Sequence, residues 1–238
     1  ATPCVQGPLT CSCRGVDAII NIAYISLAHN VIAAARKCGV SRAVFLGSTG
    51  VYTELPSKSA QAKRDAEAEI GRSGLDFTIL RATMIYGSDL DRNISRLIRY
   101  VNRCPVFPVF GRGESLVQPV HVDNVVGSVV DVLDKPTTFG KSYDIGGRSS
   151  MSYVELVRNT SKGLGRRVWR LSIPMWLAVA GVSIAGRFIN LSREQALRLN
   201  EDKNVDISPA CGDFGYNPIE FSEGVAREIA ILREKGLI

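Results

Sequence analysis

The sequence lacks an apolar run long enough to cross a membrane. The best candidate, residues 173–186 (IPMWLAVAGVSIAG), is apolar for fourteen residues before Arg187 interrupts it, whereas a spanning helix needs ~20. Two interpretations of this run stay open: a buried helix of a small domain, or a helix lying on an anionic membrane surface beside the basic segment RRVWR. The first residues also lack the basic segment and apolar run of a signal peptide. We therefore expect a cytoplasmic protein, with weak membrane-surface contact as an alternative.

Closely spaced cysteine pairs, as in a zinc ribbon, are missing as well. The three cysteines nearest to one another have no second pair and no histidine close by, so metal binding by them is only an alternative, and we expect no metal site. The apolar content needs no disulfide framework, which favours a reducing compartment. The six cysteines are Cys4, Cys11, Cys13, Cys38, Cys104 and Cys211.

Charge of one sign is not concentrated anywhere in the chain. The 238 residues are 45% hydrophobic and 22% charged, which is ordinary globular composition with enough length for one large domain or two small ones. The formal charge of +6 comes from scattered Lys and Arg rather than from a basic tail. A solvated basic surface explains this charge, so no specific nucleic-acid partner is expected.

Several short apolar runs indicate strands that are buried on both faces. They are rich in β-branched residues and show no polar alternation, as the strands of a parallel sheet do. Together they predict an α/β fold with a parallel sheet. The runs are residues 16–23 (VDAIINIA), 42–48 (RAVFLGS), 77–80 (FTIL) and 142–147 (SYDIGG).

Apolar residues at helical spacing separate these runs. One stripe ends at Gly39, a typical helix stop, and consists of Leu27, Val31, Ala34, Ala35 and Cys38. A second stripe, in residues 57–71, consists of Ala62, Ala66 and Ile70. Right-handed strand–helix–strand crossovers then give layers of helices on the sheet.

The second half of the chain changes character near residue 150. Before it, the pattern predicts helices near residues 93–101 and 123–133, separated by a loop rich in Pro and Gly. From residue 152 onward the chain reads as helices joined by short loops. We expect a boundary here, with a small, mainly helical C-terminal domain over residues 151–238.

Five segments in order resemble an extended or atypical short-chain dehydrogenase/reductase of the NAD-dependent epimerase/dehydratase kind. The resemblance implies that residues 1–150 form a partial NAD(P)-binding Rossmann-like domain, which binds NAD or NADP at the carboxyl ends of its strands. It implies that residues 151–238 lie on the substrate side. The segments are INIA, FLGSTGVY, ILRATMIYG, QPVHVDNVV and YDIGG.

The same resemblance implies which residues contact the cofactor. The main chain at Asn21 and Ala23 would lie beside the adenosine and ribose. The loop that begins with Arg81 and Ala82 and ends at Met84 would run beside the nicotinamide. Plain strand-end structure is the alternative for each of these positions.

Catalysis in this family uses a serine, a lysine and a tyrosine four residues before the lysine. A phenol with a pKa near ~10 needs an adjacent cation to become a base at neutral pH, hence this spacing on one helix face. Ser48 matches the serine and Lys63 the lysine, but Ser59 stands where the tyrosine should be. Tyr52 belongs to a turn. Lys63 is expected to reach ribose hydroxyls, with a solvated helix lysine as the alternative.

Other family features are absent from these residues. The glycine-rich turn that cradles the pyrophosphate does not occur, so we expect a sheet lacking its first βαβ unit. Met84 stands where nucleotide-sugar epimerases have an asparagine, and QPVHVDNVV lacks the usual diphosphate-gripping arginine. Arg112 is a candidate for approaching a substrate anion instead. His121 is the second substrate-side candidate, although a structural hydrogen-bonding role is more typical of this motif.

Two functions remain open. One is an NAD(P)-dependent epimerase, dehydratase or reductase acting on a sugar-like or other hydroxy/keto small molecule, in which Ser48 and Lys63 act and a water or substrate hydroxyl replaces the tyrosine. The alternative is a catalytically impaired NAD(P)-binding, scaffolding or regulatory member, similar to the complex I accessory subunit or to NmrA-like regulators. A homodimer through the helices at residues 27–38 and 57–70 is compatible with both. The substrate, and the choice between NAD and NADP, stay undetermined.

Overall fold

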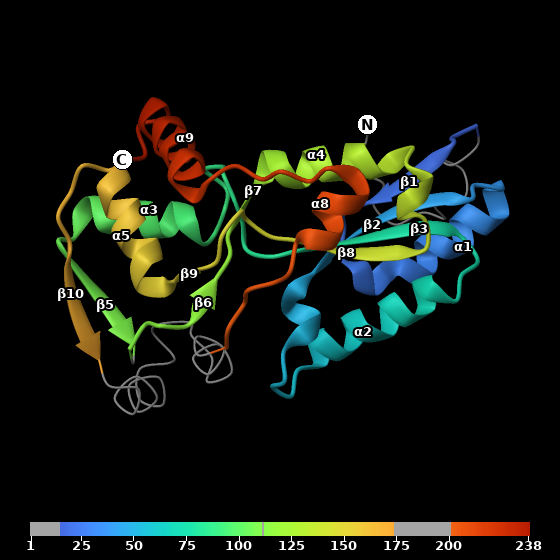
Figure 1. Ribbon diagram of the computed structural model, residues 1–238, viewed down its shortest axis with the longest axis horizontal. Coiled ribbons are helices and arrows are strands. Elements are labelled where there is room, and N and C mark those ends of the chain that lie inside the picture. Colours follow the sequence, from blue (N-terminus) through green and yellow to red (C-terminus); the bar gives the residue numbers. More distant parts are fainter. Residues whose placement is uncertain (1–14, 111, 174–200) are drawn as a thin grey trace. The chain divides into compact units, whose positions relative to one another are not determined.

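The computed structural model describes residues 15–110, 112–173 and 201–238 (Figure 1). Cys4, Cys11 and Cys13, and nearly all of the apolar run that begins at Ile173, lie outside the described residues. The chain forms two compact units, each assembled from several segments. The first unit comprises Ala1–Ala82, Val125–Ile145 and Asp206–Tyr216, and the second comprises Thr83–Asn124, Gly146–Val205 and Asn217–Ile238. The division of the chain at residue 150 stays a prediction.

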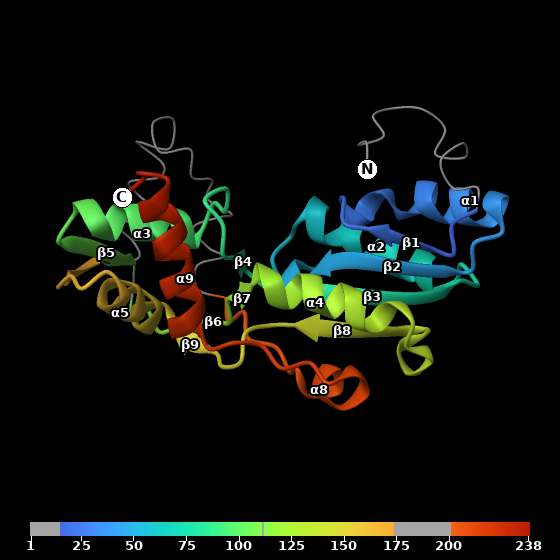
Figure 2. The same cartoon turned by 90° about the horizontal axis from the view of Figure 1, so that it is seen from above.

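A four-stranded parallel sheet is the centre of the first unit, which confirms the predicted α/β class. The strands lie in the order β1-β2-β3-β8, as Figure 2 shows. Phe45 pairs with Ile79, and Ser48 pairs with Ala82, so that β2 and β3 end level with each other. The strands are β1 (Ala18–Asn21), β2 (Arg42–Ser48), β3 (Asp76–Ala82) and β8 (Lys141–Ile145).

Helices cover both faces of this sheet. Figure 1 shows α1 (Ala28–Cys38) and α2 (Lys58–Gly71) on one face and α4 (Val122–Leu133) on the other. The apolar core under α1 and α2 includes Phe45 and Ile79, both essentially buried. A short helix, α8 (Ser208–Phe214), contacts β8. The core therefore lies between layers, as expected for buried parallel strands.

The predicted helices form, but two predicted stripe residues were wrong. Leu27 is 47% exposed and Ala62 is exposed, whereas Ile32 and Ala60 are buried. For Leu27 the reason is the point at which the helix begins. Leu27 precedes the first residue of α1 and belongs to the 3-10 turn η2 (Ile25–Leu27), so it does not follow the helical period of its neighbours.

In its described residues, the second unit is built from short strand pairs and three longer helices. Two pairs are parallel, β4–β7 and β5–β10, and β6–β9 is antiparallel. The strands are β4 (Ile85–Tyr86), β5 (Val106–Phe110), β6 (Leu116–Val117), β7 (Val120–His121), β9 (Met151–Ser152) and β10 (Trp169–Ile173). The helices are α3 (Ile94–Arg103), α5 (Tyr153–Gly163) and α9 (Phe221–Glu234), and they pack around an apolar core.

Two of these strands contradict the sequence-based expectation. The Pro/Gly-rich loop expected after α3 contains β5, and the segment after residue 152, expected to hold only helices and loops, contains β10. Pro108 lacks an N–H, but in a two-stranded ladder one side of β5 needs no donor. Within the described residues, no helix is both long and apolar enough to span a bilayer.

Candidate functional site

A hollow of about 420 Å³ lies at the carboxyl ends of the first two strands. In a doubly wound sheet this is the position where ligands bind, because the loops that follow neighbouring strands separate there. Its wall is mostly apolar, and its polar side-chain groups are the hydroxyls of Tyr24 and Ser48 and the ammonium group of Lys63. The lining residues are Ile22, Ala23, Tyr24, Ile25, Leu46, Gly47, Ser48 and Lys63.

Ser48 and Lys63 both approach Gly50. Ser48 ends β2 and caps the 3-10 helix η3 (Thr49–Tyr52), where its Oγ accepts a hydrogen bond of 3.2 Å from the Gly50 N–H. A Cβ placed on Gly50 would lie 3.1 Å from Lys63 Nζ and 3.4 Å from Ser48 Oγ. The absence of a side chain at position 50 therefore lets the ammonium and the hydroxyl approach the same point.

Asn21 supplies a buried donor at the end of β1. Its side chain is 7% exposed, and its Oδ1 accepts a hydrogen bond of 3.2 Å from the Ala23 N–H. Among the described residues, its Nδ2 is buried without an acceptor. Because an unsatisfied buried donor costs about 1–3 kcal/mol, this amide is suited to receive an acceptor from a ligand.

A charged network closes the carboxyl ends of β3 and β8. The Arg81 guanidinium donates to both carboxylate oxygens of Glu67 on α2, at 2.9–3.1 Å, and to the Tyr52 hydroxyl at 2.9 Å. Tyr52 in turn donates to Asp144 at 2.9 Å. Burial alone would lower the pKa of Arg81, but the hydrogen bonds and charge of Glu67 outweigh it and raise that pKa. The Arg81 side chain is thus engaged by Glu67 and Tyr52, which leaves its main chain to contact a cofactor.

Tyr52 cannot replace the missing tyrosine as a base. Burial, opposed by the charge of Arg81 and reinforced by Asp144, raises its pKa to about 12. At neutral pH the phenol is protonated and donates to Asp144. Ser59, at the position of the family's tyrosine, is exposed on α2. Tyr24 lines the same hollow as Lys63, but it lies after β1 and not four residues before the lysine on α2.

Tyr52→Phe is expected to leave the ultraviolet titration of the protein unchanged up to about pH 11. Tyr52 forms no tyrosinate in that range, because its pKa of about 12 lies above the ordinary value for a phenol. The measurement is the difference in tyrosinate absorbance between wild type and variant. A difference with a midpoint near pH ~10 would contradict the role given to Asp144 and Arg81.

Three of the residues proposed from the sequence belong to the second unit. Met84 is partly buried against the apolar core of that unit, and Arg112 is exposed. His121 is 4% exposed, its Nδ1 accepts from the Asp123 N–H at 3.3 Å, and its Nε2 is buried without a partner among the described residues. Burial chiefly lowers its pKa, so the imidazole is neutral at neutral pH. Their roles toward cofactor or substrate stay predictions.

Sequence reasoning missed two sets of side chains. Glu67 follows Lys63 by four residues and therefore lies near the same helix face, which was the available signal for the Arg81 network. Glu228 is fully buried on α9 within the apolar stripe of Val225 and Ile229. A glutamate inside an apolar stripe of the sequence was the signal for this buried acid.

The residues that line the hollow lie within a region of the chain that matches a known family model. A family model described as NAD(P)H-binding matches residues 9–97. This range contains β1, β2 and β3, together with Ser48 and Lys63. The match covers the residues that form the hollow.

Two curated relatives match parts of the chain. The UDP-glucose 4-epimerase of Vibrio cholerae is 24% identical over 199 residues, which make up 76% of this chain and 59% of the epimerase. The mitochondrial NADH dehydrogenase [ubiquinone] 1 alpha subcomplex subunit 9 of Arabidopsis thaliana is 29% identical over 119 residues, 50% of this chain and 29% of that subunit. The chain therefore spans less than two thirds of the length of either relative.

Solved structures share the fold over almost the whole chain. UDP-glucuronic acid 4-epimerase from Bacillus cereus in complex with NAD gives a TM-score of 0.76 at 17% identity, covering 97% of this chain and 78% of the epimerase. dTDP-glucose 4,6-dehydratase from Bacillus anthracis in complex with NAD gives 0.73 at 16% identity, covering 98% and 82%. At such identities the likeness establishes the fold.

Proposed function

We propose that this chain, which is an extended short-chain dehydrogenase/reductase-like protein of the NAD-dependent epimerase/dehydratase kind, binds NAD or NADP in the hollow at the ends of β1 and β2. There it would act as an epimerase, dehydratase or reductase on a sugar-like or other hydroxy/keto substrate. The observation that carries the proposal is that Lys63 Nζ and Ser48 Oγ both approach Gly50, just after the carboxyl end of β2.

The residues present fit a dinucleotide. The Nδ2 of Asn21 is a buried donor without an acceptor among the described residues, and the apolar wall of the hollow suits a flat aromatic base. We assign the adenosine side of the cofactor to Asn21 and the main chain of Ala23. Lys63 would bind ribose hydroxyls, and the main chain of Arg81 and Ala82 would lie beside the nicotinamide, with Met84 as a further candidate.

The nicotinamide ring of the cofactor would accept or donate the hydride. The side chains of the protein would orient the substrate and stabilise its charge. The Ser48 hydroxyl, held by the Gly50 N–H, is placed to donate to a substrate oxygen. The positive charge of Lys63 favours the anionic form of a nearby hydroxyl and so eases loss of its proton. Since Tyr52 stays protonated, the proton would pass through a water or a substrate hydroxyl. Arg112 and His121 are the proposed substrate-side residues.

A second candidate is a protein that binds the cofactor without turnover, as a scaffold or regulator. Ser59 in place of the tyrosine favours it, because proton transfer by a positioned side chain typically contributes 10²–10⁴-fold to rate. The relative in respiratory complex I, at 29% identity, is compatible with it. Turnover separates the candidates: UDP-glucose, UDP-glucuronic acid and simple hydroxy acids are incubated with protein and cofactor, and product is measured. Cofactor binding without product from any of them would favour the scaffold.

Lys63→Ala is expected to weaken NAD or NADP binding about tenfold, whereas Ser59→Ala leaves it unchanged within error. The lost charge-assisted hydrogen bond is worth about 1.4 kcal/mol, which equals that factor. Ser59 is the matched control because it lies one helical turn away on α2 and is exposed. Calorimetric titration of both variants gives the affinities. Equal losses at the two positions would remove Lys63 from the cofactor site.

A further inference from the structure

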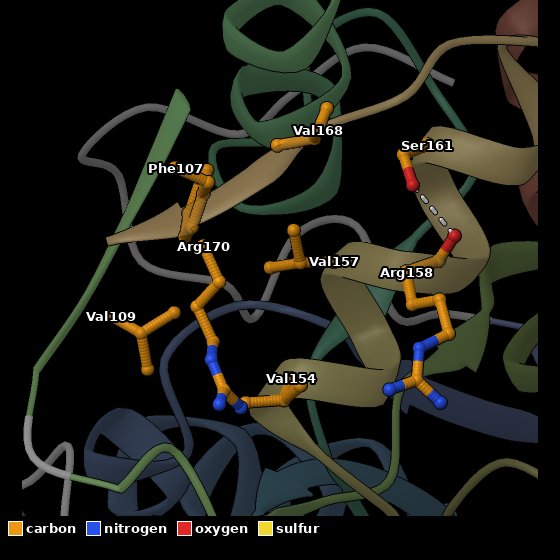
Figure 3. Close-up of a pocket in the computed structure, with 8 residues that line it drawn as sticks. All are labelled: Phe107, Val109, Val154, Val157, Arg158, Ser161, Val168 and Arg170. Atoms are coloured by element: carbon orange, nitrogen blue, oxygen red, sulfur yellow. Dashed lines mark hydrogen bonds between the residues drawn. The ribbon is translucent and has the colours of Figure 1, made fainter. Parts of the chain in front are cut away.

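The second unit contains a separate pocket between α5 and the β5–β10 ladder (Figure 3). Residues Phe107 and Val109 alternate along β5, so both side chains face the same side of the ladder. Arg170 on β10 pairs with Phe107 and faces the pocket with it. Trp169, the neighbour of Arg170, is 76% exposed. The ladder therefore presents an apolar face with one guanidinium toward α5.

The opposite wall comes from a single stripe on α5. Val154, Val157, Arg158 and Ser161 are spaced i, i+3, i+4 and i+7, which places them on one helix face. This face is fixed by a capping box at the helix start, in which the Ser152 side chain accepts from the Glu155 N–H and the Glu155 side chain accepts from the Ser152 N–H. The wall is thus apolar with a second guanidinium.

Gly113 closes one end of this pocket. A Cβ placed on Gly113 would lie 2.4 Å from Val109 Cγ1 and 2.8 Å from Val154 Cγ2, so the two valines pack directly against its backbone. Its φ of +68° is in the left-handed region that favours glycine. The Val154 N–H also donates to the Gly113 carbonyl at 3.2 Å. The valine wall is therefore held by backbone and is preformed.

The polar groups of the pocket are its two arginines. Ser161 Oγ donates to the Arg158 carbonyl at 2.8 Å, so this hydroxyl is engaged by the helix itself (dashed line in Figure 3). Neither Arg158 nor Arg170 forms an ion pair with any described residue. The acid nearest in sequence, Glu155, is held by the cap of α5. The hydrogen bonds of Ser152 chiefly, and the charge of Arg158 in addition, lower the pKa of Glu155, so this carboxylate lies near Arg158 without forming an ion pair with it. Two exposed guanidinium groups thus border an apolar floor without an ion-paired acid in the described part of the chain.

We propose that this pocket binds a small carboxylic acid with an apolar chain, whose carboxylate pairs with Arg158 and Arg170 while the chain lies against Phe107, Val109 and Val157. The volume is about 240 Å³, room for roughly eight water-sized groups at ~30 Å³ each. This corresponds to a medium-chain fatty acid rather than a long one. Guanidinium forks match carboxylates in geometry as well as charge. The site shares no residue with the cofactor hollow, so the inference goes beyond the proposed function.

Octanoate, octanol and acetate separate the parts of this proposal in calorimetric titrations of the full chain. We expect octanoate to bind, octanol to bind more weakly and acetate not to bind measurably. Arg158→Gln and Arg170→Gln should each weaken octanoate binding about threefold to tenfold and leave octanol unchanged, since exposed charge pairs are modest. Arg166→Gln, an exposed arginine outside the pocket, is the matched control and should change nothing. Equal binding of octanol and octanoate would overturn the proposal.

A pocket-filling variant and a lipid surface complete the test. Val154→Phe should abolish binding of octanoate and octanol together, with the circular dichroism spectrum of wild type showing that the unit still folds. Vesicles of anionic phospholipid distinguish a membrane headgroup from a free acid. Binding to such vesicles in the absence of octanoate binding would overturn the proposal in favour of a membrane-surface role, and so would octanoate binding that survives both arginine substitutions.

Discussion

Arg42→Met should lower the free energy of unfolding by about 3 kcal/mol. Arg42 is 6% exposed and donates to the carbonyls of Leu133 at 2.8 Å and Asp76 at 2.6 Å. It also donates to Thr78 Oγ1 at 2.9 Å and stacks on the Phe139 ring, 4.4 Å from its centroid. Methionine has a similar length but no donor, and each buried carbonyl left without one costs about 1–3 kcal/mol.

This loss of stability is expected because Arg42 binds the C-terminal end of α4. The last carbonyls of a helix have no partner within the helix, and a cation there is favoured by the helix dipole. Arg42 fills that position from β2 and so joins α4 to the sheet. Urea unfolding followed by circular dichroism measures the loss. Arg72→Met is the control, because Arg72 is exposed and bonds only within its own helix, to Ala68 at 3.1 Å; it should change stability by about 0.5 kcal/mol or less. An equal loss in both variants would show that Arg42 does not hold α4.

The sheet of the first unit could be predicted because its strands are uniform in character. Runs such as RAVFLGS have no polar alternation and are buried on both faces in the structure, with Val44 and Phe45 both at 0% exposure. The helices between them followed from apolar spacing. Which face each helix buries was harder to predict, because a residue just outside a helix does not follow its period, as Leu27 in the turn before α1 shows.

The strands of the second unit could not be predicted by the same rule. Pro108 in β5 and the glycines that follow this strand in the sequence, Gly111 and Gly113, are typical of a loop, and WRLSI in β10 mixes polar and apolar residues. These strands form because they pair with each other across more than sixty residues of chain, Trp169 with Val106 and Ile173 with Phe110. β10 is exposed from Trp169 to Ser172, so it carries no continuous apolar run of the kind that marks a strand buried on both faces.

The candidate site also has one part that could be predicted from the sequence and one part that could not. Ser48 and Lys63 could be identified because the family places them in a fixed motif, and the structure brings both to Gly50. The ion pair of Arg81 with Glu67 and its link to Asp144 join three elements that are separate in sequence. The spacing of Glu67 from Lys63 marks one member of this network, but no spacing rule connects Glu67 to Arg81 or to Asp144.

The buried acid Glu228 on α9 has a pKa far above the ordinary value of a glutamate. Glu228 is fully buried, and its Oε2 accepts from the Gly87 N–H at 3.1 Å. Burial chiefly, and the neighbouring carboxylate of Asp91 in addition, raise its pKa from 4.5 to about 9. Tyr86 packs over the same helix at Gly224, and Arg99 lowers the pKa of Glu228 only slightly by comparison. At neutral pH this side chain is therefore a neutral acid.

Glu228→Gln should remove most of the pH dependence of stability between about pH 5 and pH 9. The folded-state pKa of Glu228 is raised, so the unfolded chain releases the proton first, and the free energy of unfolding falls as pH rises from 4.5 toward about 9. The loss in wild type should be on the order of 5 kcal/mol across that window, at 1.36 kcal/mol per pKa unit. Glutamine keeps the shape and the acceptor for the Gly87 N–H but never ionises, so its unfolding free energy should stay nearly level. Urea titrations at pH 5, 7 and 9 measure the slope, and the exposed Glu234→Gln on the same helix should retain that of wild type. If wild type and Glu228→Gln share one slope, Glu228 is ionised in the folded protein at neutral pH and the buried neutral acid does not exist.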